Sequence, residues 1–396
     1  MVPPLDTTDC EYTVLHLPDE LLALSHSFLG DGEFGFIAPV CKRFKSTYLN
    51  RVSDKKTTTV ERATCSISRA RTYLEYAGDD AREPGWFWYC VARYGRVGVM
   101  EWAHQRGHSR FWNTLAVRTW GSIGEVTCAR AAEYGQLLAL QWLRQNGCKW
   151  CFRTCSAAAE GGHLPILQWA RANGCKFVET CSAAARGGHL SILQWLRANG
   201  CEWDSITCQI AAEGGHLSIL QWVRESGCYW DSSTCSAAAR GGHLSILQWA
   251  RANGCEWDSL TCAYAAGGGH LSILQWARAN GCNWDSETCA CAARGGHLSI
   301  LQWARKNGCE WWSNTCFRAA AGGHLSVLQW ARANGCDWDK YTCAEAAFGG
   351  HLSVLQWARE NGCEWDGGTY QSAQKCGNQD VLNYVIDEGG LQADSW

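Results

Sequence analysis

Most of this chain is one short unit copied in tandem. The string TCSAAARGGHLSILQWLRANGCEWDSI, which begins at Thr180, returns with small changes along the sequence. Its opening threonine recurs every 27 residues, with a single step of 26, at Thr127, Thr154, Thr180, Thr207, Thr234, Thr261, Thr288, Thr315, Thr342 and Thr369. A fixed period of roughly 20 to 50 residues is typical of a solenoid or a propeller. It therefore overrides the several separate domains that a length of 396 residues would otherwise suggest.

A weaker copy of the unit precedes these ten. It spans residues 87–107, and Trp102 lies 40 residues before Trp142, which is one period plus a 13-residue insertion. At the other end, a worn final copy begins at Thr369 and has Tyr384 in the tryptophan column. We therefore expect about 11 units in the segment 87–389.

Each unit has the pattern of two short helices joined by a tight turn. An alanine-rich stretch ends at Gly187 and Gly188, and glycine permits the positive φ that a tight reversal requires. Apolar residues then follow on one helical stripe, at Leu190, Ile192, Leu193, Trp195 and Leu196. We expect Thr180 to be the N-cap of the first helix, and Asn199 with Gly200 to end the second.

The unit resembles the ankyrin repeat. TC stands where that family has Thr-Pro, the Ala-Ala and Gly-His pairs match, and GC replaces Gly-Ala, over the segment 87–389. This unit is shorter than the ~33 residues of the family, and most of the missing residues fall after GC, where the family forms its β-hairpin finger. The first helix also lacks the family's histidine. The resemblance implies an all-α helix-turn-helix solenoid with short or absent fingers, whose first helices line a concave binding surface.

Two tryptophan columns run through the repeats. One lies in the second helix, and we expect it to form a buried ladder between neighbouring repeats, at Trp142, Trp169, Trp195, Trp222, Trp249, Trp276, Trp303, Trp330 and Trp357. The other lies in the connecting segment, at Trp150, Trp203, Trp230, Trp257, Trp284, Trp311, Trp338 and Trp365. Two interpretations of the second column remain open: packing beneath the loops, or a partly exposed aromatic row that grips a partner.

Histidine and cysteine also recur in fixed columns. A catalytic histidine would not need eight copies, so we expect a structural bond across the turn to a neighbouring repeat, as the Gly-His residues of the resembled family make, for His163, His189, His216, His243, His270, His297, His324 and His351. The 25 cysteines favour small buried thiols between repeats. A thiol-rich metal or redox protein is the alternative, but the pair at Cys148 and Cys151, with Cys155 nearby, alone has a zinc-like spacing.

Variation among the units is concentrated in the first helix, one, two and five residues after its cysteine. Residues without a framework role can mix aromatic and charged groups, as a binding face does; neutral drift on a solvated face is the alternative. The candidate partner-binding residues are Arg186, Ile210, Glu213, Arg240, Tyr264, Arg294, Phe317, Arg318, Glu345 and Phe348.

The segment before the repeats resembles an F-box, with LeuPro and GluLeu at its start and ValCys followed by a basic residue and an aromatic at its end. His26 and Gly35 depart from that motif. The resemblance implies docking on the adaptor subunit of a cullin-RING ubiquitin ligase through Leu17, Pro18, Glu20, Leu21, Leu22, Phe28 and Leu29. A small helical cap for the solenoid is the alternative.

Composition excludes several other classes of function. A net charge of −3 and interleaved charges offer no basic face for nucleic acid. No apolar run approaches the ~20 residues of a membrane span, and no leader sequence is evident. Nucleotide-binding, zincin and hydrolase motifs are missing. We expect a non-enzymatic interaction adaptor of the cytoplasm or nucleus, without cofactor or metal, with an F-box-like module (13–50), a linker and capping helix (51–86), the solenoid (87–389) and a tail (390–396).

Overall fold

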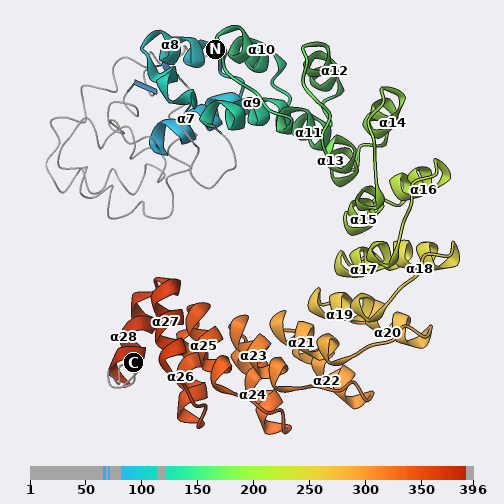
Figure 1. The fold of residues 1–396 in the computed structure, drawn as a ribbon, viewed down its shortest axis with the longest axis vertical. Coiled ribbons are helices and arrows are strands. Elements are labelled where there is room, and N and C mark those ends of the chain that lie inside the picture. The colour runs from blue at the N-terminus through green and yellow to red at the C-terminus, as the bar shows by residue number, and fades with distance from the viewer. Residues whose placement is uncertain (1–65, 68–69, 72–81, 114–121, 389–396) are drawn as a thin grey trace, which may run out of the picture. The chain divides into compact units, whose positions relative to one another are not determined.

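A computed structural model describes residues 66–67, 70–71, 82–113 and 122–388 of the chain. The F-box-like segment 13–50, with its seven candidate adaptor-binding residues, lies outside these ranges. The chain divides into an N-terminal unit that ends at Cys201 and a C-terminal unit that begins at Glu202, and the two are described separately. In both units, most of the described residues lie in pairs of short α-helices (Figure 1).

The helix pairs follow the predicted units. In the N-terminal unit they are α7 (Arg82–Arg93) with α8 (Val97–Gln105), α9 (Ile123–Glu133) with α10 (Leu137–Gln145), α11 (Arg153–Glu160) with α12 (Leu164–Ala172), and α13 (Thr180–Arg186) with α14 (Leu190–Ala198). A 3-10 helix, η2 (His108–Asn113), lies within the predicted insertion.

In the C-terminal unit the pairs are α15 (Ser205–Glu213) with α16 (Leu217–Glu225), α17 (Ser232–Arg240) with α18 (Leu244–Ala252), α19 (Ser259–Gly267) with α20 (Leu271–Ala279), α21 (Ser286–Arg294) with α22 (Leu298–Lys306), α23 (Ser313–Ala321) with α24 (Leu325–Ala333), α25 (Lys340–Phe348) with α26 (Leu352–Glu360), and α27 (Gly367–Cys376) with α28 (Gln379–Asp387). The segments between pairs, such as 226–231, contain no hairpin. The predicted all-α solenoid without fingers is confirmed over the described repeats.

Side-chain size sets how closely the helices approach. First helices pack directly on the first helices of neighbouring pairs, as α9 does on α11 and α19 on α21, whereas second helices make few contacts with one another. Small residues such as Ala238 and Ala239 of α17 are buried at these contacts, while the second helices carry leucine and tryptophan. Within the C-terminal unit, the first helices consequently lie along the inner side of the curve that the row follows (Figure 1).

The core of each repeat is small and aliphatic. In the α17–α18 repeat, Cys235 and Ala238 meet Ile246, Leu247 and Ala250, and none of these side chains is more than 1% exposed. The tryptophans of the second helices are half-buried, so the prediction that they form a fully buried ladder is wrong. Their position is the reason: the aliphatic residues of the second helix fill the stripe that faces the core, and each tryptophan lies at the edge of that stripe.

The tryptophans nevertheless join neighbouring repeats. Trp249 of α18 meets Trp230, from the preceding connecting segment, edge-on, with 5.6 Å between the ring centroids. The guanidinium of Arg224 in α16 lies over the Trp230 ring at 4.2 Å, and its Nη1 donates to the carbonyl of Cys228. The same stack of arginine, loop tryptophan and helix tryptophan recurs in both units. The contacts show that the second tryptophan column packs, although its members are half-buried except for the buried Trp230, and binding of a partner by their exposed edges stays a prediction.

Aspartate, rather than threonine, caps most of the first helices. The carboxylate of Asp231 accepts a hydrogen bond from the backbone N–H of Ser233 at 2.9 Å. Equivalent aspartates cap α15, α19, α21, α25 and α27. The prediction that Thr180 is an N-cap is wrong, because α13 begins at Thr180 itself and the threonine column is buried inside the repeat.

The α13 repeat has lost this cap. Its connecting segment is the one shortened by a residue, and it contains no aspartate. Glu179 occupies the cap position at φ 54°, and it is the sole non-glycine residue with a positive φ among those described. A left-handed conformation costs such a residue about 1–2 kcal/mol. The shortened segment therefore leaves α13 with a strained and uncapped start.

Replacing the strained residue should stabilise the protein. We expect Glu179→Gly to raise the free energy of unfolding by about 1 kcal/mol, because glycine adopts positive φ without a Cβ clash. Urea unfolding followed by circular dichroism measures the change. The control is Glu256→Gly, at an exposed position of another connecting segment without positive φ, which should be neutral or destabilising. Equal effects of the two variants would contradict strain at Glu179.

A glycine-glycine-histidine turn fastens each repeat to the one before it. Nε2 of His243 donates to the carbonyl of Glu213, the last residue of α15, at 3.0 Å. This bond satisfies one of the carbonyls that a helix end leaves unpaired. The ring also fills the space over Gly215, where a Cβ would lie 2.7 Å from its Cε1. The same bond, at 3.0 to 3.2 Å, confirms the predicted structural role for His163, His189, His243, His270, His297, His324 and His351.

We call the histidine ring and its hydrogen bond to the preceding helix the clamp. Two glycines with nearly the same φ separate the effect of the clamp on stability from the effect of positive φ. Gly242 and Gly254 have φ of +82° and +81°, but a Cβ on Gly242 would lie 2.6 Å from the His270 ring, whereas one on Gly254 would meet nothing within 4 Å. We expect Gly254→Ala to cost about 1 kcal/mol. Gly242→Ala should cost a further 1–3 kcal/mol, roughly, because it displaces His270 from the carbonyl of Arg240. Urea unfolding measures both, and equal losses would exclude the clamp.

Candidate functional site

The candidate binding residues lie on the first helices, on the side that the repeat framework leaves unused. We call the exposed and half-buried residues one, two and five places after the first-helix cysteine the inner face. In the N-terminal unit, Arg186 of α13 is exposed and forms an ion pair with Glu160 of α11 at 3.5 Å. The remaining candidates lie in the C-terminal unit, on α15 to α25.

Side chains of α15, α17 and α19 form an ion pair and a cation–π contact with one another. Arg240 forms an ion pair with Glu213 at 3.6 Å, and its guanidinium lies over the Tyr264 ring at 4.0 Å. Ile210 is half-buried beside them on α15. The structure thus brings together three of the predicted residues, but as a ladder of contacts between repeats. Exposed ion pairs of this kind contribute about 0–1 kcal/mol, so they remain easily displaced.

Further along the same unit, the inner face carries unpaired groups. The side chains of Arg294 and Glu345 form no ion pair or hydrogen bond among the described residues, and Phe348 is 54% exposed. Arg318 lies 5.7 Å from the ring of its neighbour Phe317 and forms no ion pair with any acidic residue that the structure describes. We call these five residues of α21, α23 and α25 the open segment. Exposed aromatic groups beside unpaired arginines are typical of protein-binding surfaces.

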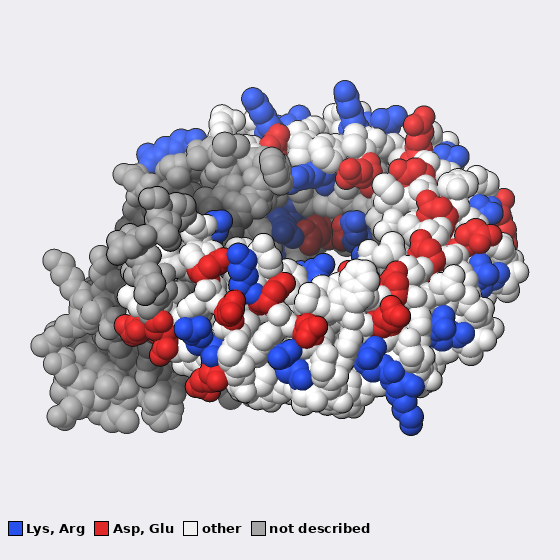
Figure 2. Space-filling model, turned by 60° about the horizontal axis from the view of Figure 1, so that its bottom comes forward, with Lys and Arg blue, Asp and Glu red and all other residues white. Residues whose placement is uncertain are grey.

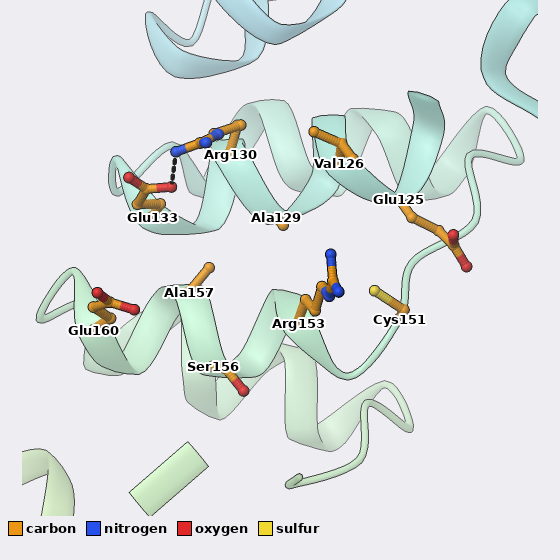
Figure 3. Close-up of a pocket in the computed structure, with 10 residues that line it drawn as sticks. All are labelled: Glu125, Val126, Ala129, Arg130, Glu133, Cys151, Arg153, Ser156, Ala157 and Glu160. Carbon is orange, nitrogen blue, oxygen red and sulfur yellow. Dashed lines mark hydrogen bonds and ion pairs between the residues drawn. The ribbon is translucent and has the colours of Figure 1, made fainter. Parts of the chain in front are cut away.

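A shallow pocket of about 250 Å3 lies on the inner face of the N-terminal unit, between α9 and α11 (Figure 3). Its lining residues are Glu125, Val126, Ala129, Arg130, Glu133, Cys151, Arg153, Ser156, Ala157 and Glu160. The guanidinium of Arg153 points from α11 across the gap towards α9. Arg153 is not among the candidates predicted from the sequence, because it lies before the repeat threonine, outside the three variable columns. The sequence does mark this repeat, since Cys151 stands in the column where six repeats of the C-terminal unit have the capping aspartate.

Neither sign of charge dominates the surface. On the face that Figure 2 displays, basic and acidic side chains are interspersed among uncharged ones. No group of three or more His, Cys, Asp or Glu residues in the described part of the chain is placed to hold a metal ion. Over the same residues, no helix has the length and apolar character needed to cross a bilayer.

Cysteines form close pairs within each repeat. Sγ of Cys128 in α9 lies 3.6 Å from Sγ of Cys148, and Cys148 donates to the carbonyl of Gly124 at 3.4 Å. In the C-terminal unit, the second cysteine of each pair likewise donates to the carbonyl of the residue that caps the first helix of its own repeat, as Cys228 does to Asp204 at 3.2 Å. We expected contacts between repeats, but these bonds join the two helices of one repeat. The bond with Cys148 and burial both raise the pKa of the Cys128 thiol, so it stays protonated.

Accessibility separates three thiols from the others. Cys151, Cys291 and Cys376 are partly exposed, whereas the remaining described cysteines are buried. Among the described cysteines, we expect a maleimide reagent to label these three first in the native protein, and Cys151→Ser and Cys291→Ser each to remove one fast site. Burial raises the pKa of Cys151 and of Cys291, so their labelling rates should keep rising at a pH where a free cysteine has already levelled off. Simultaneous labelling of all thiols would contradict the buried pairs.

Comparisons with known proteins give a limited result. No family model matches the chain, and no curated protein matches it. Among solved structures, the chain is similar to the human ASB11 ankyrin repeat domain, with 18% identity and a TM-score of 0.33 over 39% of this chain and 84% of that one. It is also similar to the maize pentatricopeptide repeat protein PPR10, with 15% identity and a TM-score of 0.32 over 93% and 63% of the two chains.

A third solved structure is PPR10 in complex with an 18-nucleotide psaJ RNA element, with 13% identity and a TM-score of 0.34 over 97% of this chain and 68% of that one. The assignment of this chain as a helical-repeat protein rests on its own helix pairs, whose contacts recur from repeat to repeat.

Proposed function

We propose that this chain is a non-enzymatic scaffold that binds another protein through its inner face. The observation that carries the proposal is the contrast between the columns that hold the repeats together and the residues of the inner face. Histidine, glycine, tryptophan and cysteine columns are engaged in holding the repeats together. In the open segment, by contrast, the side chains of Arg294, Glu345 and Phe348 have no ion pair or hydrogen bond with any described residue.

The mixture of groups supports a protein as the partner. Nucleic acid binding needs a row of basic groups to neutralise phosphates, whereas the open segment contains the acidic Glu345 as well as its two arginines. Protein-binding surfaces combine arginine and aromatic anchors with a polar rim. The resemblance of the unit to the ankyrin repeat agrees with this choice, because the first helices line the binding surface of that family.

Variants of the open segment test the proposal. We expect Arg294→Glu with Phe348→Ala to remove a defined set of proteins that the wild-type chain retains from its native cells, measured by crosslinking, purification and quantitative mass spectrometry. The matched control is Lys306→Glu with Tyr229→Ala, which reverses one exposed charge and truncates one exposed aromatic outside the inner face. Identical sets for the two variants, or a set that is lost on nuclease treatment, would refute the proposal.

The finer proposal is that the chain is an F-box substrate receptor of a cullin-RING ubiquitin ligase, working in the cytoplasm. Its support is the LPDELL string of residues 17–22. Purification of the full chain should then recover the ligase adaptor. Leu21→Asp with Leu22→Asp should lose that adaptor and keep the inner-face partner. Absence of the adaptor from the wild-type sample would leave a plain interaction scaffold.

A further inference from the structure

The pocket between α9 and α11 has an apolar floor and a charged rim. Val126, Ala129 and Ala157 supply the floor, and carboxylates and guanidinium groups surround it (Figure 3). Its volume of about 250 Å3 is enough for one side chain. Ser156 lines the pocket, but its hydroxyl is already used, since it donates to the carbonyl of Val178 at 2.8 Å.

Every carboxylate on the rim has a partner. Glu133 pairs with Arg130 at 2.5 Å, and Glu160 pairs with Arg186 at 3.5 Å. Glu125 completes the capping box of α9, where its Oε2 accepts a hydrogen bond from the backbone N–H of Ser122 at 2.8 Å. Cations therefore balance Glu133 and Glu160, whereas Glu125 is held by a backbone N–H group.

Arg153 is the exception among the arginines of α9 to α14. Arg130 and Arg186 are in the ion pairs just described. Arg144 and Arg197 each donate to a backbone carbonyl, at 2.6 and 2.8 Å, and Arg171 lies over the Phe177 ring at 4.5 Å. The guanidinium of Arg153 has no ion pair or hydrogen bond within the described residues. Among the described residues, Arg153 is thus the one guanidinium group of these helices that no side chain or carbonyl holds.

The other repeats show what is unusual at this position. Where they carry a capping aspartate, such as Asp231, this repeat has Cys151, and α11 has no side-chain cap. The column of Arg153 holds no basic residue in the C-terminal unit, where Ile206, Ser233, Leu260, Glu287, Asn314, Tyr341 and Gly368 occupy it. Loss of a carboxylate at Cys151 and gain of a guanidinium group at Arg153 both make this site more positive than the same site in the repeats that have the capping aspartate.

We propose that the pocket receives the carboxylate of a glutamate or aspartate side chain from the bound protein. Arg153 holds the carboxylate through two parallel N–H donors, which is the geometry that guanidinium and carboxylate groups favour. The aliphatic part of the incoming side chain lies on Val126, Ala129 and Ala157. A phosphate is a poorer occupant, because Arg153 offsets one negative charge and the second would add to the repulsion from Glu125, Glu133 and Glu160 on the rim. The inference rests on the proposed protein-binding function and names one chemical feature of the partner.

The test uses small probes on the full chain, so it does not depend on knowing the partner. The probes are N-acetylglutamate N-methylamide, its uncharged glutamine analogue and its phosphoserine analogue. Binding is followed at low ionic strength by NMR, through the Nε–Hε signal of Arg153, which is assigned by its loss in Arg153→Gln. We expect the glutamate probe to shift this signal and the glutamine probe to bind about tenfold more weakly or worse, because it lacks the charge-assisted bonds.

The matched control is Arg96→Gln, which removes an exposed arginine outside the pocket. Binding of the glutamate probe, read on the backbone amides of α9 and α11, should survive Arg96→Gln and fall about tenfold or more in Arg153→Gln. The inference is overturned if the glutamine probe binds as well as glutamate, if the phosphoserine probe binds more tightly, or if Arg153→Gln leaves binding unchanged. Failure here leaves the proposed function to be judged separately by the open-segment variants.

Discussion

The hydrogen bond from a histidine Nε2 to the last carbonyl of the preceding first helix is the contact on which the stack depends. It satisfies a helix end and sets the distance between repeats, as His243 shows with Glu213 at 3.0 Å. Glycine is required on both sides of the ring, because a Cβ at Gly215 or Gly241 would occupy the same space. Short first helices rich in alanine can then pack closely, and the bulkier second helices spread apart.

Much of this arrangement could be predicted from the sequence, because it depends on contacts that recur with the period. The repeat length and the helix pairs followed from the spacing and composition of the columns, whereas the missing fingers and the histidine bond followed from the resemblance to the ankyrin repeat. The N-cap did not, since threonine and aspartate are both good capping residues and both recur with the period, so the spacing alone does not distinguish Asp231 from Thr234 as the cap of α17. Trp249 was misplaced because a periodic stripe does not distinguish its centre from its edge.

The pocket could not be found by comparing columns of variable residues. It arises where one repeat departs from the framework itself, with Cys151 in place of an aspartate and Arg153 in a column that is otherwise not basic. Which rim charges compensate one another depends on distances between α9, α11 and α13, such as the 3.5 Å between Glu160 and Arg186. A linear sequence does not give such distances, so the uncompensated guanidinium became visible once the helices were placed.

The fixed register of these contacts has a consequence for how such a chain can change in length. Each clamp joins a histidine to a carbonyl about one period earlier, so gain or loss of a complete copy leaves every remaining clamp with an equivalent partner. A fractional loss behaves differently: the single missing residue before Thr180 coincides with an uncapped helix and with Glu179 in a left-handed conformation. Gene duplication and deletion in whole copies can therefore lengthen or shorten the reach of this protein, while frame-preserving losses of one or two residues weaken it.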